Sequence, residues 1–403
     1  MSITGVGRGS ASHSVQLDVL RGLALVLMIV NHVGVSLVDP SHEQYRAVSA
    51  LIFLGSFAPV VFFFTTGFGI GIGIGGRGGT WAGFGSTLLK AGLLVLADQF
   101  MFWKSGIPWG MDFLGFIGLS SVLVTAASHI RKPLRFCSSV IVGLLLLRFG
   151  IGPPLRDHLN LPPLVAWLLG VAPLDNVSYP LSPWLVYPLL GFVIARRNHV
   201  APASTPDSRW IWMGIAALGA LALAGAMYHA HSTFFRWGTM NFAFFVLSIA
   251  VGILILSAAW QIGARWPRAA GFLSVRGIVS FAVVPIHYGL IELCSVWGST
   301  QEGAELLGEM AVLVIFSVAL SRAFAAGVNR GISRIRPGTV WFAMSTLILI
   351  CVTILWFVPQ QRSFTFSAFV IGQLAIAALL AVRSQRRDGP SHLVSRFERT
   401  QSS

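Results

Sequence analysis

Long apolar runs recur along the whole chain, and they constrain its fold more than any other feature. A helix needs about 20 predominantly apolar residues to cross the hydrocarbon of a bilayer. The runs that reach or approach this length lie at 16–38, 47–75, 83–103, 112–130, 134–152, 179–196, 209–230, 239–261, 273–296, 304–326, 338–359 and 364–383. A shorter apolar run at 163–172 indicates a re-entrant or interfacial segment. The sequence therefore predicts an all-α, polytopic bundle of eleven or twelve transmembrane helices.

Charged residues are too few for a protein whose surface faces water. They make up 10% of the chain, against 55% for hydrophobic residues, whereas globular domains carry about 25% charged residues. This composition excludes a soluble enzyme, a disordered chain and a fibre. The three cysteines, Cys137, Cys294 and Cys351, lie in apolar runs without the spacing of metal ligands. We therefore expect small core residues at these positions, and neither a disulfide framework nor a metal site.

The number of basic residues alternates from one loop to the next. The N-terminal segment and every second loop after it, with the C-terminal tail, together hold twenty Arg and Lys residues. The loops between them hold six: Arg46, Lys104, Arg148, Arg156, Arg236 and Arg362. Cytoplasmic loops carry such an excess, so we expect both termini in the cytoplasm. The net charge of +14 then reflects membrane topology rather than a nucleic acid partner. The predicted parts are a cytoplasmic segment at 1–15, a membrane domain at 16–383 and a basic cytoplasmic tail at 384–403.

Ionisable side chains inside apolar runs indicate function, because they are costly in lipid. Arg21 and His32 are eleven residues apart in the first run, which puts them on one helix face about 16 Å apart. Asp18, one turn before Arg21, could pair with it. With the predicted topology, His287 falls at nearly the same depth as His32. We expect a common polar cavity lined by these residues and by others toward the outer half: Asp98, Asp112, Trp184, Glu292 and Glu309.

Each of these groups also has a purely structural explanation. Asp18 and Arg21 could form an interfacial ion pair, and a histidine within the membrane often hydrogen-bonds to a neighbouring helix. Asp98 and Glu309 lie close to the ends of predicted spans. The residues alone leave both explanations open.

Glycines are spaced regularly in the segment FFFTTGFGIGIGIGGRGG (62–79). Gly67, Gly71 and Gly75 form one helix stripe, and Gly69 and Gly73 form another. Such stripes favour close helix–helix packing. The alternative is an extended ligand that approaches the backbone closely. A dinucleotide site is excluded, because no strand precedes the segment and no βαβ unit follows it.

Several segments resemble the transmembrane acyltransferase superfamily. The run LDVLRGLALVLMIVNH (17–32) is similar to its first-span signature, in which a His follows an Arg after ten residues. Three segments resemble the branch that contains heparan-alpha-glucosaminide N-acetyltransferase and its bacterial relatives: FAPVVFFFTTGFGIGIG (57–73), DFLGFIGLSSVL (112–123) and PLSPWLVYPLLGFVIAR (180–196). SFAVVPIHYGL (280–290) is similar to a late motif of acyltransferase type 3 proteins.

The resemblance implies acyl transfer in a bacterial cytoplasmic membrane. A cytoplasmic acyl-CoA would donate its acyl group to a hydroxyl or amine of a carbohydrate or glycolipid on the outer side. Acetyl-CoA is the expected donor, and another acyl-CoA is the alternative. By this analogy Arg21, with Asp18 beside it, would hold the CoA phosphates. Asn31, Asp112 and Trp184 are the residues expected to bind the acceptor. The resemblance implies no metal, and it leaves a homodimer open.

Acyl transfer needs a base that removes a proton from the acceptor and a donor that stabilises the developing oxyanion. Burial favours the neutral form of an imidazole, which can accept a proton, so His32 is the candidate base. His287 or Asn31 would orient the base or stabilise the oxyanion. In the heparan-type branch an Asn usually matches His32, and a His follows some eleven residues later. Here His42 stands one residue off that spacing, so it could instead be the base or form an acyl-histidine.

Other functions fit parts of the same pattern. Twelve spans with both ends inside, and a polar cavity with histidines, would suit a proton-coupled secondary transporter. A succinyltransferase that acts on periplasmic glucans would share the first-span motif and use a different acyl-CoA. A non-catalytic scaffold or lipid-binding protein fits least, because it would not explain an Arg and a His on one buried helix face.

Overall fold

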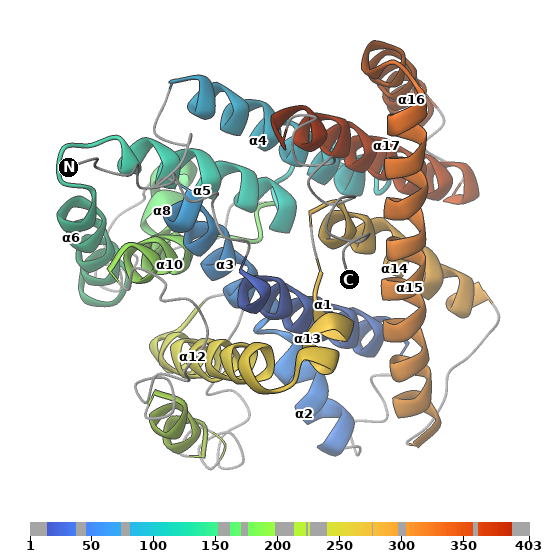
Figure 1. The fold of residues 1–403 in the computed structure, drawn as a ribbon. Coiled ribbons are helices and arrows are strands. Elements are labelled where there is room, and N and C mark those ends of the chain that lie inside the picture. Colours follow the sequence, from blue (N-terminus) through green and yellow to red (C-terminus); the bar gives the residue numbers. More distant parts are fainter. Residues whose placement is uncertain are drawn as a thin grey trace, which may run out of the picture. The chain divides into compact units, whose positions relative to one another are not determined.

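A computed structural model describes most of the chain (Figure 1). The described residues are 14–37, 46–73, 81–151, 162–170, 176–197, 213–222, 225, 240–275, 277–296, 304–357 and 362–388. They form two compact units. The first unit comprises 1–28, 53–95 and 110–275, and the second comprises 29–52, 96–109 and 276–403.

The first unit is built from helices of the N-terminal and central parts of the chain. They are the first half of α1 (Val15–Leu37), α3 (Ala58–Gly73), most of α4 (Trp81–Trp103), α5 (Phe113–Ser128), α6 (Pro133–Leu145), the π-helix η3 (Leu146–Ile151), α8 (Pro163–Leu169), α9 (Leu181–Trp184), α10 (Val186–Arg197), α12 (Phe242–Arg265) and α13 (Pro267–Leu273). Within this unit α3 packs along α10 and against α5, and α6 also packs on α10.

The second unit contains the second half of α1, most of α2 (Arg46–Gly55), and the C-terminal helices. These are α14 (Ile278–Val296), α15 (Ala304–Arg334), α16 (Pro337–Phe357) and α17 (Arg362–Asp388). α17 packs against α14, α15 and α16. The buried side chain of Gln373 on α17 donates a hydrogen bond of 2.8 Å from Nε2 to the carbonyl oxygen of Ala97 on α4.

The prediction of an all-α, multi-pass protein is confirmed. Seven helices in the described part are long and apolar enough to cross a membrane: Val15–Leu37, Ala50–Gly73, Pro133–Ile151, Phe242–Arg265, Leu306–Ile332, Pro337–Phe357 and Phe364–Val382. Shorter apolar helices lie at Phe113–Ser128, Met213–Ala222 and Val279–Ser295. The described residues contain no strand, only an isolated bridge between Met111 and Val177. The predicted total of eleven or twelve spans stays a prediction, as does the side of the membrane on which each terminus lies.

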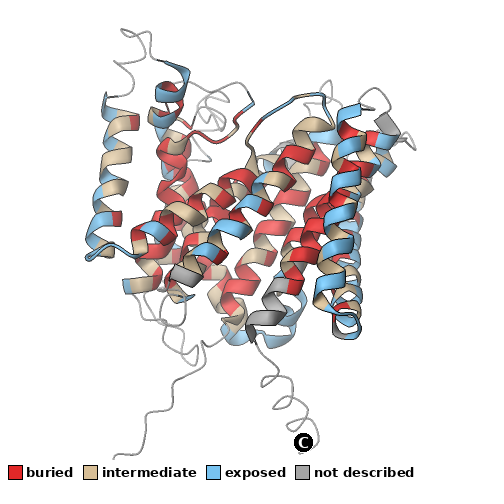
Figure 2. Cartoon of the chain, turned by 90° about the horizontal axis from the view of Figure 1, so that it is seen from above, coloured by how far each residue is buried: buried red, intermediate tan, exposed pale blue. Residues whose placement is uncertain are grey.

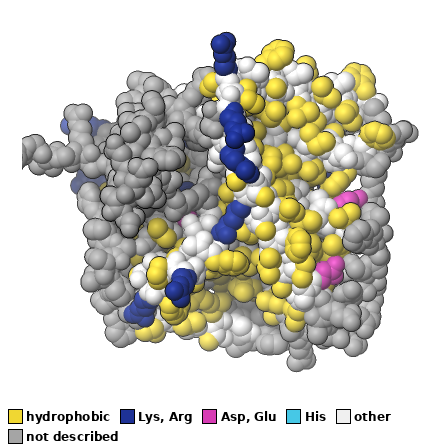
Figure 3. Space-filling model, turned by 45° about the vertical axis from the view of Figure 1, so that its right-hand side comes forward, with side chains coloured by type: hydrophobic (Ala, Val, Ile, Leu, Met, Phe, Trp, Pro, Cys, Tyr) yellow, Lys and Arg dark blue, Asp and Glu magenta, His cyan; other side chains and the backbone are white. Residues whose placement is uncertain are grey.

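The apolar surface of these helices is consistent with a lipid environment. Figure 2 shows that many helices have a buried face and an exposed face. On α16 the exposed side chains include Phe342, Leu349 and Phe357. Hydrophobic side chains cover much of the face seen in Figure 3, with Lys and Arg side chains gathered in a band beside them. Such a distribution is expected where lipid tails replace water as the solvent.

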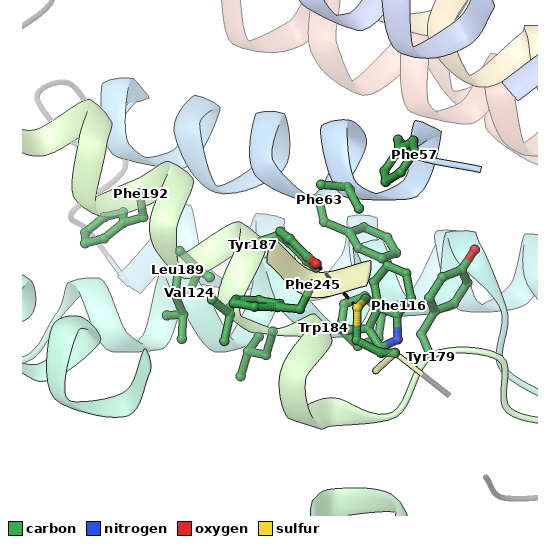
Figure 4. Packing of buried hydrophobic residues seen from close by; sticks show 14 of the residues in the cluster. Phe57, Phe63, Phe116, Val124, Tyr179, Trp184, Tyr187, Leu189, Phe192 and Phe245 are labelled. Atoms are coloured by element: carbon green, nitrogen blue, oxygen red, sulfur yellow. Dashed lines mark hydrogen bonds between the residues drawn. The ribbon is translucent and has the colours of Figure 1, made fainter. Parts of the chain in front are cut away.

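An aromatic cluster forms the core of the first unit. Phe63, Phe116, Tyr179 and Trp184 lie together in it (Figure 4). The ring centroids of Tyr179 and Trp184 are 4.8 Å apart, with the rings nearly perpendicular, an arrangement that aromatic pairs favour. Through these side chains, α3, α5, α9 and the segment before α9 pack together in one core.

The two glycine stripes of α3 have different surroundings. A Cβ atom added to Gly67 would overlap the carbonyl oxygen of Pro188 on α10, and one on Gly71 would lie 2.6 Å from the Cβ of Ala195. This stripe therefore packs against α10, as the spacing predicts. A Cβ on Gly73 would meet nothing within 4 Å, and one on Gly69 would lie 3.5 Å from Nη2 of Arg21. In the second stripe, Gly69 therefore lies beside Arg21.

The packing of α3 on α10 predicts that Gly67→Ala is strongly destabilising. The added methyl group would meet a backbone carbonyl that cannot move without shifting α10, and overpacking of this kind costs about 1–3 kcal/mol or more. The unfolding temperature in detergent should therefore fall. Gly92→Ala on α4 is the matched control, because a Cβ there would meet nothing within 4 Å. Equal unfolding temperatures for the two variants would contradict the packing described here.

Candidate functional site

Helix α1 carries four of the predicted site residues: Asp18, Arg21, Asn31 and His32. It runs unbroken from Val15 to Leu37, because its sequence is an apolar run without proline. Asp18 and Arg21 belong to the first unit, and Asn31 and His32 belong to the second.

His32 and His287 meet in the second unit. Nδ1 of His32 lies 2.8 Å from Nε2 of His287, within hydrogen-bonding distance. The two rings are stacked, with centroids 5.1 Å apart and planes inclined by 18°. His287 is buried at 1% exposure, and His32 is half-buried. The structure thus joins two histidines that the sequence places 255 residues apart. Their similar depth in the membrane stays a prediction.

The other ring nitrogen of His287 also has a hydrogen-bonding partner. Its Nδ1 lies 2.8 Å from the carbonyl oxygen of Val283, one turn earlier on α14. A chain of close contacts therefore runs from this carbonyl through His287 to His32. Both rings of the pair have a defined orientation before any substrate arrives.

Tyr288 and Lys104 lie near the pair, a position that was predicted for neither of them. The Tyr288 ring stacks on His32 at 5.0 Å and lies 4.3 Å from His287, measured between centroids. Nζ of Lys104 lies 5.5 Å from the centre of the Tyr288 ring, and within similar distances of Phe366 and Phe369. Tyr288 follows His287 directly, so its position had a sequence signal. Lys104 looks like an ordinary residue at a helix end.

Asn31 uses its side chain to fasten α1 to α2. Its Nδ2 donates a hydrogen bond of 2.9 Å to the carbonyl oxygen of Ile52. Close by, a Cβ atom on Gly34 would overlap the side chain of Ile52. Asn31 therefore has a structural function beside His32, and its predicted contact with an acceptor stays a prediction.

Arg21 and Asp18 form the ion pair that their spacing predicts. Nη1 of Arg21 lies 3.1 Å from Oδ1 of Asp18, and the side chains are 30% and 2% exposed respectively. The backbone of the same turn is fixed as well, since the amide of Val275 donates to the carbonyl oxygen of Asp18 at 3.2 Å. Arg21 keeps an accessible part, and its Nη2 lies 3.5 Å from where a Cβ atom on Gly69 would stand.

Asp112 and Trp184 lie in the first unit, in different settings. Asp112 precedes the first residue of α5 and is hydrogen-bonded to Ser178. Trp184 is fully buried in the aromatic cluster, against Phe63, Tyr179 and Tyr187. Contact of either residue with an acceptor stays a prediction, as does a polar cavity common to all the predicted residues.

Two further expectations concern His42 and metal binding. His42 lies outside the described residues. Among the residues that the structure describes, no three or more His, Cys, Asp or Glu side chains are grouped so that they could hold a metal ion. Cys137 and Cys351 are buried, Cys294 is half-buried, and none of these three described cysteines forms a disulfide.

Comparison with protein families gives a match over more than half of the chain. The family model of the heparan-alpha-glucosaminide N-acetyltransferase catalytic domain matches residues 14–232. This range includes Asp18, Arg21, Asn31 and His32, and it ends before His287 and Tyr288. No curated protein and no solved structure matches the chain.

Proposed function

Because the chain belongs to the heparan-alpha-glucosaminide N-acetyltransferase catalytic family, we propose that it transfers an acetyl group from acetyl-CoA to an amine or hydroxyl of a sugar-type acceptor. It is a multi-pass membrane protein of an acetyltransferase family. The observation that carries the proposal is the contact of His32 with His287. His32 lies on α1, the helix that also holds Arg21.

His32 acts as the general base in this proposal. The nitrogen or oxygen of the acceptor attacks the thioester carbonyl carbon while its proton passes to His32. The carbon–sulfur bond then breaks, and the departing thiolate of CoA takes the proton back. The half-buried position of His32 supports this role, since a base there is partly shielded from water and still has an accessible part.

Arg21 is proposed to bind phosphate groups of CoA. A guanidinium has five N–H donors, and the ion pair with Asp18 engages Nη1. Gly69 presents no side chain to Nη2, which lies 3.5 Å from where a Cβ atom on Gly69 would stand. Along the unbroken α1, the helical rise places Arg21 and His32 about 16 Å apart, a span suited to the pantetheine arm.

The proposed location is a bacterial cytoplasmic membrane, with both termini in the cytoplasm. The alternation of basic residues between loops supports this orientation. Acetyl-CoA would then reach Arg21 from the cytoplasm, and the acceptor, a carbohydrate or glycolipid, would approach His32 from the outer side.

Arg21→Ala is expected to weaken acetyl-CoA binding by roughly 10- to 100-fold, since a hydrogen bond to a charged group contributes about 1.5–3 kcal/mol. Calorimetry with purified protein in detergent measures the dissociation constant. Asp18→Asn/Arg21→Gln removes both charges without leaving a buried carboxylate unpaired, and it should weaken binding as well. Arg330→Ala, at an exposed position on α15, is the control. Unchanged affinity in both Arg21 variants would refute the role given to Arg21.

A further inference from the structure

We infer that His287 is the positioning residue of the site, fixing His32 in the tautomer whose Nε2 receives the proton of the acceptor. The inference rests on the proposed function, in which His32 is the base. It also assigns a role to the part of the chain beyond residue 232, where the family match ends. A protein that ended with the matched region would lack the partner of His32.

The hydrogen on His287 is located by its contact with Val283. A carbonyl oxygen can only accept a hydrogen bond, so Nδ1 of His287, 2.8 Å from it, must carry the hydrogen. His287 is 1% exposed, and a buried charge without a paired carboxylate would be costly. The ring is therefore neutral, and its Nε2 has a lone pair and no hydrogen.

The hydrogen on His32 follows from this. Nδ1 of His32 and Nε2 of His287 are 2.8 Å apart, and a hydrogen bond needs one hydrogen between them. Since Nε2 of His287 has none, Nδ1 of His32 donates. A neutral His32 then has its lone pair on Nε2, the ring nitrogen that does not face its partner.

The rings around the pair preserve this arrangement. Tyr288 stacks on His32 and also contacts His287, which restricts rotation of both imidazoles. Lys104 lies over Tyr288 and over two phenylalanine rings of α17, and a cation in such a place is attracted to the ring faces. These contacts keep His32 from turning its Nδ1 toward the substrate.

The arrangement also accounts for each proton during transfer. When Nε2 of His32 takes the proton of the acceptor, His32 becomes an imidazolium ion whose Nδ1–H stays donated to His287. The lone pair of His287 stabilises this cation, because a hydrogen bond from a charged donor is stronger than a neutral one. The proton then leaves from Nε2 to the thiolate of CoA. His287 gains and loses none.

Two substitutions of His287 separate positioning from mere packing. His287→Leu removes the acceptor for His32, whereas His287→Gln can place an amide oxygen near the former position of Nε2. We expect kcat for acetyl transfer from acetyl-CoA to methyl α-glucosaminide to fall about 100-fold in His287→Leu, the lower end of what a positioned base contributes. The KM for acetyl-CoA should be unchanged, and His287→Gln should recover most of the loss.

Nitrogen-15 NMR of histidine-labelled protein tests the tautomer directly, with the His32 signal assigned through its loss in His32→Ala. Wild type and His287→Gln should show hydrogen on Nδ1 of His32, and His287→Leu should show a mixture. Hydrogen on Nε2 in the wild type, or equal activity losses in both variants, would overturn the inference. A wild type that has the expected tautomer and transfers no acetyl group would uphold the pairing and overturn the proposed function instead.

Discussion

His32→Ala is expected to lower the rate of acetyl transfer by about 10²–10⁴-fold, the contribution of a well-placed general base, while acetyl-CoA still binds. The reason is that the hydrogen-bonded contact with His287 and the stacking on Tyr288 orient this imidazole for proton transfer. Binding should survive because Arg21, to which the proposal assigns the CoA phosphates, is unchanged. Transfer is measured from radiolabelled acetyl-CoA to an amino sugar, and binding by calorimetry.

His129→Ala provides the matched control for His32→Ala. His129 is exposed at the end of α5, where its Nδ1 lies 2.8 Å from the carbonyl oxygen of Thr125, and it should be replaceable without loss of activity. If His32→Ala retained full activity, the base would have to be sought elsewhere. His42, the alternative from the sequence, would then be the next residue to change.

Trp184→Ala is expected to destabilise the protein by about 3–5 kcal/mol, the usual cost of truncating a buried Trp or Phe to Ala. The indole is fully buried and contacts Phe63, Tyr179 and Tyr187 (Figure 4). Its removal leaves a cavity between helices that cannot all close around it. A marked fall of the unfolding temperature in detergent is the expected result.

Trp184→Phe separates this structural role from the predicted contact with an acceptor. Phenylalanine keeps most of the aromatic packing, so the unfolding temperature should stay close to that of the wild type. An unchanged KM for the acceptor would assign Trp184 to the core. A raised KM at an unchanged unfolding temperature would instead support the role in acceptor binding that its place in the sequence predicts.

Much of the fold follows from the sequence for a simple physical reason. In lipid every backbone amide needs a partner within its own helix, so an apolar run of sufficient length can be read as a helix with little ambiguity. α1 (Val15–Leu37) and α12 (Phe242–Arg265) agree with the predicted runs 16–38 and 239–261 within a few residues. The Arg21–Asp18 pair followed in the same way from spacing along one helix.

The interruptions inside predicted spans could not be foreseen. The run 47–75 is divided between α2 and α3 at Ser56 and Phe57, and 134–152 changes from an α-helix to a π-helix at Leu146. An apolar sequence pattern is the same on both sides of such a break. Only packing against neighbouring helices decides where the break falls.

The site shows the same limit. The predicted spans placed His32 and His287 at nearly the same depth, but the sequence could not show that their rings meet. Which side of a helix faces which neighbour depends on the packing of the whole bundle. The position of Lys104 over Tyr288 depends on α4, α14 and α17 at once. The sequence also did not show that the amide of Asn31 donates a hydrogen bond to a backbone carbonyl of α2.

The most direct test of the central claim is acetyl transfer by the purified protein in proteoliposomes, with radiolabelled acetyl-CoA and methyl α-glucosaminide. The account predicts a labelled, acetylated sugar that forms with wild type and is lost with His32→Ala. Labelled product that forms equally well without His32 would contradict the mechanism. Counterflow of a solute, with neither acetyl-CoA binding nor labelled product, would contradict the function itself and favour a transporter.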